Sequence, residues 1–157
     1  MKSVDALTEQ FRARGLKVTP QRQSIFRALS SSTEHPTAEA VYATVSAEMP
    51  TISLRTVYQT LNDLAAMGEL NALDLGTGST RFDPTVEPHH HMVCDSCGRI
   101  VDVHADLPVV PPVDGEGGFT VTATEIVFRG RCAACTTALA GILPNDPNQP
   151  NTGEPHG

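Results

Sequence analysis

The sequence contains no tryptophan, and only 4% of its 157 residues are aromatic. No apolar run approaches the roughly 18 residues that a membrane-spanning helix needs, and residues 1–20 lack the apolar core of a secretion signal. These absences argue against a membrane protein and against a secreted one, so we expect a cytoplasmic protein with no membrane partner. Apolar residues still make up 39% of the chain, which is enough for one compact domain or two small ones.

Basic residues are scarce, and the formal net charge of −7 argues superficially against a nucleic-acid partner. The charge is unevenly distributed, however, with −1 on residues 1–80 and −6 on residues 81–157. A local basic face is compatible with phosphate contact, although an ordinary solvated helix face gives the same pattern. The basic residues of the stretch without acids between residues 10 and 33 are Arg12, Arg14, Lys17, Arg22 and Arg27.

Cysteine is also rare, but its spacing is informative. The four cysteines form two CxxC pairs separated by 34 residues, with none left over. Two such turns can close a tetrahedral four-thiolate site with no open position, which is typical of structural zinc. The alternatives are two disulfides or a redox CxxC of the thioredoxin type, and the lack of a secretion signal disfavours disulfides. The predicted zinc ligands are Cys94, Cys97, Cys132 and Cys135.

A second kind of metal ligand lies beside the first cysteine pair. Imidazoles and carboxylates are concentrated in residues 81–102, and these donors suit a borderline or harder divalent ion such as iron or manganese. In an extended strand, His89 and His91 would share one face while His90 points away. The sequence therefore predicts two metal sites of different chemistry.

Residues 1–83 show the periodicity of four helices followed by two short strands. The first two helices cover residues 4–15 and 20–29, the third follows Thr37 and ends before Pro50, and the fourth follows Ser53 and stops at Gly68. The strands cover residues 70–75 and 80–82, around a glycine-rich turn. This order predicts a winged helix. The fourth helix should expose polar side chains suited to reading DNA, although a polar solvent face is the alternative; they are Arg55, Thr56, Tyr58, Gln59 and Asn62.

Beyond residue 89 the chain predicts a small sheet. Residues 119–128 alternate and are rich in Thr and Val, so we expect a strand that pairs with strands near 91–94 and 99–104. Prolines and glycines between 104 and 118 leave room for at most one helical turn. Residues 133–143 predict a short helix and residues 144–157 a disordered tail. The predicted class is α+β.

Several motifs in order resemble the ferric uptake regulator (Fur) superfamily of metal-dependent bacterial repressors, over residues 4–140. They are Val18-Thr-Pro-Gln-Arg22, His35-Pro-Thr-Ala-Glu39, Ile52-Ser53 with Thr56-Val-Tyr58, Arg81-Phe-Asp83, His89-His-His91, Cys94-Asp-Ser-Cys97-Gly98 and the last cysteine pair. The resemblance implies a homodimer that binds palindromic double-stranded DNA operators. It implies a winged-helix DNA-binding domain at residues 1–83, a hinge at 84–88, and an α/β dimerisation and metal-binding domain at 89–143.

The same resemblance implies a regulatory Fe²⁺ or Mn²⁺ site between the two domains. Its ligands would be His35, Asp83, His89, His91 and Asp102. Without a metal, His35 would be a turn or capping residue, and Asp83 would start a turn before Pro84. The implied DNA contacts are Arg14, Lys17, Gln21, Arg22, Ser53, Arg55, Thr56, Tyr58 and Gln59.

Asp102 makes the chain most similar to the peroxide-sensing, PerR-like branch of that family. In that branch, Fe²⁺-catalysed oxidation of a ligand histidine, here His35 or His89, releases the metal and the DNA and induces peroxide-defence genes. The alternative is an iron-responsive or zinc-responsive repressor of metal uptake.

Two further hypotheses concern the same donors. A hydrolytic metalloenzyme would need a general base, and no glutamate lies within the segment from His89 to His91 as it does in HExxH, so we expect no enzyme. A third metal site is a further possibility. Its candidate ligands are His90, His104 and Glu125.

Overall fold

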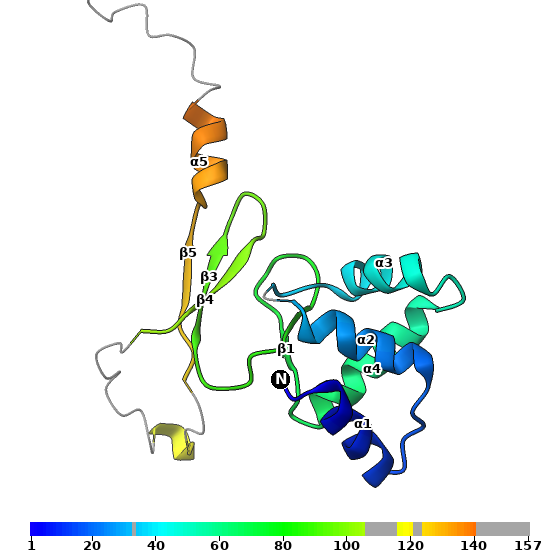
Figure 1. The fold of residues 1–157 in the computed structure, drawn as a ribbon. Coiled ribbons are helices and arrows are strands. Elements are labelled where there is room, and N and C mark those ends of the chain that lie inside the picture. The colour runs from blue at the N-terminus through cyan, green and yellow to red at the C-terminus, as the bar shows by residue number, and fades with distance from the viewer. Residues whose placement is uncertain (33, 106–115, 121–123, 141–157) are drawn as a thin grey trace, which may run out of the picture.

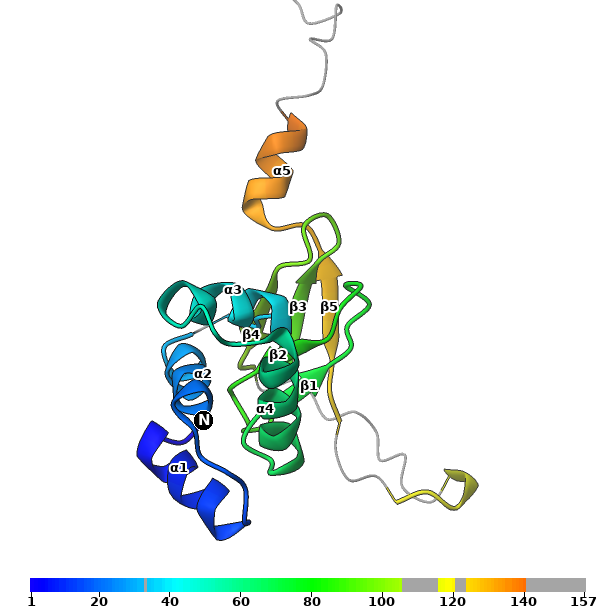
Figure 2. The ribbon, with the colours of Figure 1, turned by 90° about the vertical axis from the view of Figure 1, so that its right-hand side faces the viewer.

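The computed structural model describes residues 1–32, 34–105, 116–120 and 124–140. Helices α1 to α4 form one part together with a two-stranded sheet, and a three-stranded sheet with helix α5 forms the other (Figure 1). Turned by 90°, the molecule shows α5 extending beyond the sheet, away from the helices (Figure 2). The elements are α1 (Val4–Ala13), α2 (Pro20–Ser30), α3 (Ala38–Glu48), α4 (Leu54–Ala66), β1 (Asn71–Leu73), β2 (Arg81–Asp83), β3 (His90–Cys94), β4 (Ile100–Val103), a 3-10 turn (Glu116–Gly118), β5 (Val127–Gly130) and α5 (Ala133–Ala140).

Local side chains determine where the helices begin. The hydroxyls of Thr19, Thr37 and Ser53 accept hydrogen bonds from the backbone N–H three residues later, at 3.3, 3.2 and 3.1 Å. Each satisfies an N–H that has no partner inside its helix, which stabilises the helix start by about 1 kcal/mol. The predicted caps are therefore confirmed.

The main core lies among the four helices. Phe11, Phe26 and Leu61 are among its fully buried side chains, and the rings of Phe11 and Phe26 meet edge to face with centroids 4.9 Å apart. Phe82 of β2 closes this core from the side of the β1–β2 sheet, which is antiparallel. Helix α4 packs its apolar stripe against α2 and α3 and leaves its opposite face exposed. The predicted order of four helices and a two-stranded wing is confirmed, as is the α+β class.

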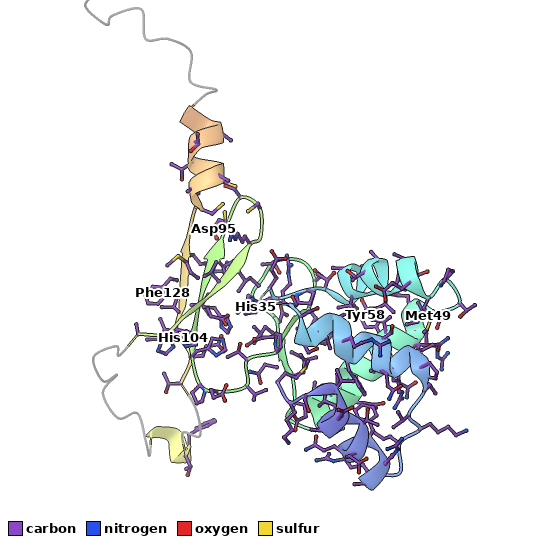
Figure 3. The ribbon with its side chains drawn as sticks, viewed as in Figure 1. His35, Met49, Tyr58, Asp95, His104 and Phe128 are labelled. Atoms are coloured by element: carbon purple, nitrogen blue, oxygen red, sulfur yellow. The ribbon has the colours of Figure 1, made fainter. Side chains whose placement is uncertain are left out.

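In the second sheet, the strand order is β4-β3-β5, with β3 antiparallel to β4 and parallel to β5. His91 pairs with Asp102 on one side and with Val127 on the other. Because side chains alternate across a sheet, these residues share the face turned toward the helices. The opposite face carries exposed apolar side chains, here called the apolar sheet face; they are Met92, Val101 and Phe128. Figure 3 labels Phe128 on the side of the sheet away from the helices.

The strand predicted at 119–128 is only partly correct. Strand β5 begins at Val127, and the described residues before it are not in a strand. Strand β3 ends at Cys94, and its pairing with β5 runs from His91 to Cys94, so only residues 127–130 have a partner there. Within the predicted proline-rich loop, Glu116–Gly118 form one 3-10 turn, which agrees with the prediction of at most one helical turn, and residues 106–115 lie outside the described ones. The end of the last predicted helix and the predicted disordered tail also lie outside the described residues.

Side chains from the wing and the second sheet join the two parts. Leu75 of the wing packs with Val93 and Ile100. Arg81 donates hydrogen bonds to the carbonyl oxygens of His35 and Gly98, at 3.3 and 3.2 Å. Arg129 donates in the other direction, to the carbonyl oxygen of Leu75 at 2.7 Å. We call Arg81 and Arg129 the arginine clasp, and it places the loop that carries His35 beside the second sheet.

The proposed hinge, residues 84–88, links β2 to β3, and the predicted division into domains stays a prediction. Over the described part of the chain, the helices are too short or too polar to cross a bilayer.

Candidate metal centres

The four cysteines converge at the end of the second sheet. Their sulfur atoms all lie within 4.8 Å of one another, and none of the four is in a disulfide. The first pair sits in a tight turn in which the Gly98 N–H donates to the carbonyl oxygen of Cys94 at 2.8 Å. Strand β5 brings the second pair alongside, because the Cys132 N–H lies 3.3 Å from the Cys94 sulfur. The disulfide alternative is therefore not supported.

The cluster has the dimensions and charge of a zinc site. The sulfurs of Cys97 and Cys132 are 3.8 Å apart, close to the roughly 3.8 Å edge of a tetrahedron with zinc–sulfur bonds of about 2.3 Å. Hydrogen bonds from the backbone N–H groups of Cys132 and Cys97 lower the pKa of Cys94 to about 6. Neighbouring sulfurs, first that of Cys132 and then that of Cys97, raise the pKa of Cys135 to about 12. All four cysteines could therefore be thiolates at once only with a cation among them.

The second cluster lies between the wing and the second sheet, around His35 (Figure 3). His35, Asp83, His89 and His91 each offer one donor atom, and these atoms lie within 4.8 Å of one another. Asp102 of β4 joins them, because its Oδ1 is 2.8 Å from His35 Nε2 and 3.5 Å from His89 Nε2. The structure therefore brings together all five residues predicted for the regulatory site, and their role as ligands stays a prediction.

Each carboxylate in this cluster is fixed through one oxygen. Asp83 Oδ1 accepts from the Thr85 N–H at 2.7 Å, which is the turn contact expected of an aspartate before proline. Asp102 Oδ2 accepts from the Thr85 hydroxyl at 3.3 Å. The remaining oxygens, Asp83 Oδ2 and Asp102 Oδ1, are buried and lack a hydrogen-bond partner. Asp83 therefore starts a turn with Oδ1 and directs Oδ2, an oxygen that could bind a metal ion, toward the histidines.

Two of the imidazoles are fixed through Nδ1. His89 Nδ1 is 2.8 Å from the carbonyl oxygen of Glu87, and His91 Nδ1 is 2.7 Å from the carboxylate of Glu125. Both partners are acceptors, so both Nδ1 atoms carry the proton, and in neutral rings the lone pair is then on Nε2. The two Nε2 atoms face each other at 3.0 Å. Two facing lone pairs repel, so this arrangement favours a metal ion or a proton between the two Nε2 atoms.

The donors fit a hard or borderline divalent ion. Donors bonded at about 2.1 Å to one ion lie roughly 3.0–3.4 Å apart, and His89 Nε2 is 3.2 Å from Asp83 Oδ2. Burial is the main factor that lowers the pKa of His35, and it outweighs the opposing effect of Asp83 and Asp102. A neutral imidazole is the form that binds metal. Three imidazoles and two carboxylates match the donor preference of iron or manganese better than that of a thiophilic ion.

One side chain, that of Asp102, connects this cluster to solvent. The side chains of the three histidines and Asp83 are at most 3% exposed, whereas that of Asp102 is 23% exposed. A cavity of about 260 Å³ opens beside it, lined by Ser30, His35, Asp83 and Asp102 among others. A small neutral molecule can therefore reach the cluster from the side of His35 and Asp102.

The candidate third site is not assembled in the described residues, whose only groups of three or more potential ligands are the two above. His90 Nδ1 accepts from the Ile126 N–H at 3.2 Å, and Glu125 contacts His91. The His104 ring is tilted by 38° relative to that of His89, with ring centroids 5.5 Å apart. In the sequence Glu125 is a candidate ligand only, and no local pattern marks its contact with His91.

The residues predicted to contact DNA fall into two groups. Those on α4 mostly face outward, and Tyr58 donates a hydrogen bond to Glu39 of α3 at 2.6 Å (Figure 3). Arg22, in contrast, pairs with Asp63 at 2.8 Å and its side chain is only 13% exposed, so its placement indicates a structural role. The other exposed or partly exposed candidates are Arg14, Lys17, Gln21, Ser53, Arg55, Thr56 and Gln59.

Comparison with known sequences identifies one family. The model of the ferric uptake regulator family matches residues 13–126. The chain is 36% identical over 143 residues to the peroxide-responsive repressor PerR of Staphylococcus epidermidis, covering 86% of this chain and 94% of that protein. It is 43% identical over 128 residues to PerR of Staphylococcus aureus strain Mu50, covering 79% of this chain and 85% of that protein.

Solved structures agree with the fold. The ferric uptake regulator of Helicobacter pylori superposes with a TM-score of 0.67 at 20% identity, covering 87% of this chain and 97% of that one. The Pseudomonas aeruginosa regulator with manganese gives 0.61 at 26% identity, covering 80% and 97%. PerR from Streptococcus pyogenes gives 0.50 at 27% identity, covering 86% and 94%.

Proposed function

Because the chain belongs to the ferric uptake regulator family, we propose that it is a metal-dependent transcriptional repressor that senses peroxide. Its named relatives at 36% and 43% identity are peroxide-responsive repressors, and it spans most of their length. The repressor would bind operator DNA when its regulatory metal is present and leave the DNA when peroxide oxidises a metal ligand.

One observation carries this proposal. The Nε2 atoms of His89 and His91 face each other at 3.0 Å while the Nδ1 atom of each ring is occupied by an acceptor. Buried, unpaired oxygens of Asp83 and Asp102 are directed to the same place. The cluster is therefore arranged for a cation, which we assign as Fe²⁺ or Mn²⁺, with structural Zn²⁺ at the four cysteines.

The proposed metal ligands come from both parts of the molecule, so metal binding can control DNA binding. His35 and Asp83 come from the helical part and its wing, whereas His89, His91 and Asp102 come from the second sheet. An ion bound by both groups favours one angle between the proposed DNA-binding domain, residues 1–83, and the proposed dimerisation domain, residues 89–143. Losing a donor removes that preference, and with it the arrangement that fits the operator.

The DNA-facing and dimer-facing surfaces lie on different parts of the molecule. We assign operator reading to the exposed side of α4, with Arg55, Thr56 and Gln59 toward bases and phosphates. We assign dimerisation to the apolar sheet face, where Met92, Val101 and Phe128 are 51%, 45% and 37% exposed. A two-fold dimer of this kind matches a palindromic operator.

Peroxide sensing follows from the ion and its neighbours. Bound Fe²⁺ would supply the redox chemistry that breaks the O–O bond of peroxide. One oxygen atom would add to a ring carbon of a ligating imidazole, and the other would leave as water. His35 lines the cavity of about 260 Å³ beside Asp102, and its Nδ1 has no partner in the described structure, so we take it as the first candidate for oxidation. His89 is the second candidate.

The test is operator binding by the zinc-containing protein loaded with Fe²⁺ or with Mn²⁺, before and after peroxide. We expect peroxide to abolish DNA binding of the iron form alone and to add one oxygen atom to the peptide containing His35 or His89, measured by mass spectrometry. Unmodified histidines, with release of DNA only by chelation, would instead support a repressor of metal uptake.

Asp102→Glu provides the matched variant. Glutamate keeps the negative charge but places the carboxylate one methylene group farther from the main chain. Residue 102 is the most exposed of the five proposed ligands. We expect it to weaken peroxide sensitivity of the iron form more than it weakens DNA binding. Equal sensitivity of the two proteins to peroxide would remove Asp102 from the sensing mechanism.

A further inference from the structure

Strand β5 places Glu125 against the second cluster, here called the regulatory cluster. Its residues are His35, Asp83, His89, His91 and Asp102. The backbone there is fixed to β3 by two hydrogen bonds, from His91 N–H to the Ile126 carbonyl at 3.1 Å and from Ile126 N–H to His90 Nδ1 at 3.2 Å. Glu125 precedes Val127, which pairs with His91, by two positions, and its side chain reaches the His91 ring. Its Oε1 is 2.7 Å from His91 Nδ1.

Glu125 is not positioned as a ligand of the same ion. It contacts Nδ1 of His91, whereas the Nε2 atom on the far side of that ring faces the other donors. The carboxylate is 43% exposed, while the His91 side chain is 3% exposed. One side of the imidazole therefore meets a solvated anion and the other meets the buried cluster.

The three imidazoles differ in what holds them. His91 donates to a carboxylate, His89 donates to the neutral carbonyl of Glu87, and Nδ1 of His35 has no partner. A carboxylate on Nδ1 fixes the tautomer with the lone pair on Nε2, fixes the ring orientation, and makes the imidazole a more basic ligand than a carbonyl does.

We propose that Glu125 is a positioning residue for the regulatory metal, acting through His91. It holds the His91 ring in one orientation with Nε2 toward the ion and anchors the ion to the second sheet, so that His35, whose Nδ1 has no partner, is the weaker attachment. This inference rests on the proposed function, because it concerns the same cluster. It deepens that function by dividing the ligands into a firmly held group on the sheet and a more easily released one on the helical part.

The experiment compares Glu125→Ala and Glu125→Gln with the control Glu87→Ala. Glu87 is also an exposed acid beside the cluster, but only its main-chain carbonyl contacts a ligand histidine. Manganese affinity is measured by calorimetry on the zinc-containing protein. We expect Glu125→Ala to weaken Mn²⁺ binding by about 10- to 100-fold, Glu125→Gln to fall in between, and Glu87→Ala to stay near the unaltered protein.

A second measurement separates positioning from general destabilisation. Nitrogen-15 shifts of the His91 ring, recorded without regulatory metal, should show the Nδ1–H form in the unaltered protein and in Glu87→Ala. They should show a mixture of tautomers in Glu125→Ala, with an unchanged melting temperature. Equal Mn²⁺ affinity in Glu125→Ala and Glu87→Ala overturns the inference. Failure of the unaltered protein to bind Mn²⁺ at all would instead contradict the proposed function.

Discussion

Arg22 and Arg55 are both predicted DNA contacts, yet their surroundings differ. Arg22 lies over the Phe11 ring, 5.1 Å from its centroid, and pairs with Asp63. Arg55 is exposed on α4. We expect Arg55→Ala to lower operator affinity by about 1–3 kcal/mol without changing stability. We expect Arg22→Ala to lower the free energy of unfolding by about 1–3 kcal/mol. Urea unfolding and a DNA titration of both variants check this, and loss of affinity without loss of stability in Arg22→Ala would contradict it.

His35 makes stability depend on pH when the regulatory metal is absent. Burial lowers its pKa in the folded protein, so the unfolded chain binds more protons at this residue and stability rises with pH. The contribution is complete above the unfolded value of roughly 6.5 and is lost as pH falls through the lower, folded pKa. We therefore expect the zinc-containing protein to lose more unfolding free energy than His35→Asn does between about pH 7.5 and about pH 5.5. Urea unfolding at both values measures it, and parallel losses would show that His35 is not the group responsible.

At the scale of the elements, the helices could be predicted because their signals are local. The hydroxyls of Thr19, Thr37 and Ser53 lie within three residues of the N–H groups they cap, and Gly68 with φ +71° ends the helix it follows. Strand β5 could not be delimited in the same way. Its first residue depends on where β3 offers a partner, which alternation within residues 119–128 does not encode.

The candidate site divides along the same line. The His89 and His91 pair could be expected to share a face because alternation in a strand is local. The contact of Glu125 with His91 depends on the parallel register of β5 against β3, which joins residues 34 positions apart. The convergence of His35 with Asp102 likewise needs the helical part to lie against the sheet, and only the family resemblance predicted it.

The arginine clasp holds the helical part and its wing against the second sheet. Arg81 reaches two carbonyl oxygens, those of His35 and Gly98, and a planar guanidinium can serve both at once whereas an ammonium is a point donor. We expect Arg81→Lys to lower the free energy of unfolding by about 1–2 kcal/mol. Arg99→Lys is the control, because Arg99 is exposed in the same region. Urea unfolding of the pair is the measurement, and equal stability would show that the clasp contributes nothing.

In the whole molecule, the regulatory cluster and the apolar sheet face lie on opposite sides of the second sheet. His91 and Asp102 are paired across β3 and β4 on the helical side, and the next pair, Met92 and Val101, faces away. Only the sheet itself therefore separates the proposed metal ligands from the proposed dimer interface. We infer that the second sheet is the fixed base, and that the helical part moves against it when a ligand is lost.

A substitution of Phe128 tests whether the second sheet forms the dimer interface. Its side chain is part of the apolar sheet face, so burying it against a second copy would stabilise a dimer and charging it would oppose one. We expect Phe128→Asp to shift the protein from dimer to monomer and to weaken operator binding by at least about 100-fold, because a monomer meets only one half-site. Phe119→Asp is the control, since Phe119 is 74% exposed and lies outside the sheet. Sedimentation velocity and a DNA titration on both variants give the answer. A dimeric Phe128→Asp with normal affinity would move the interface to another surface.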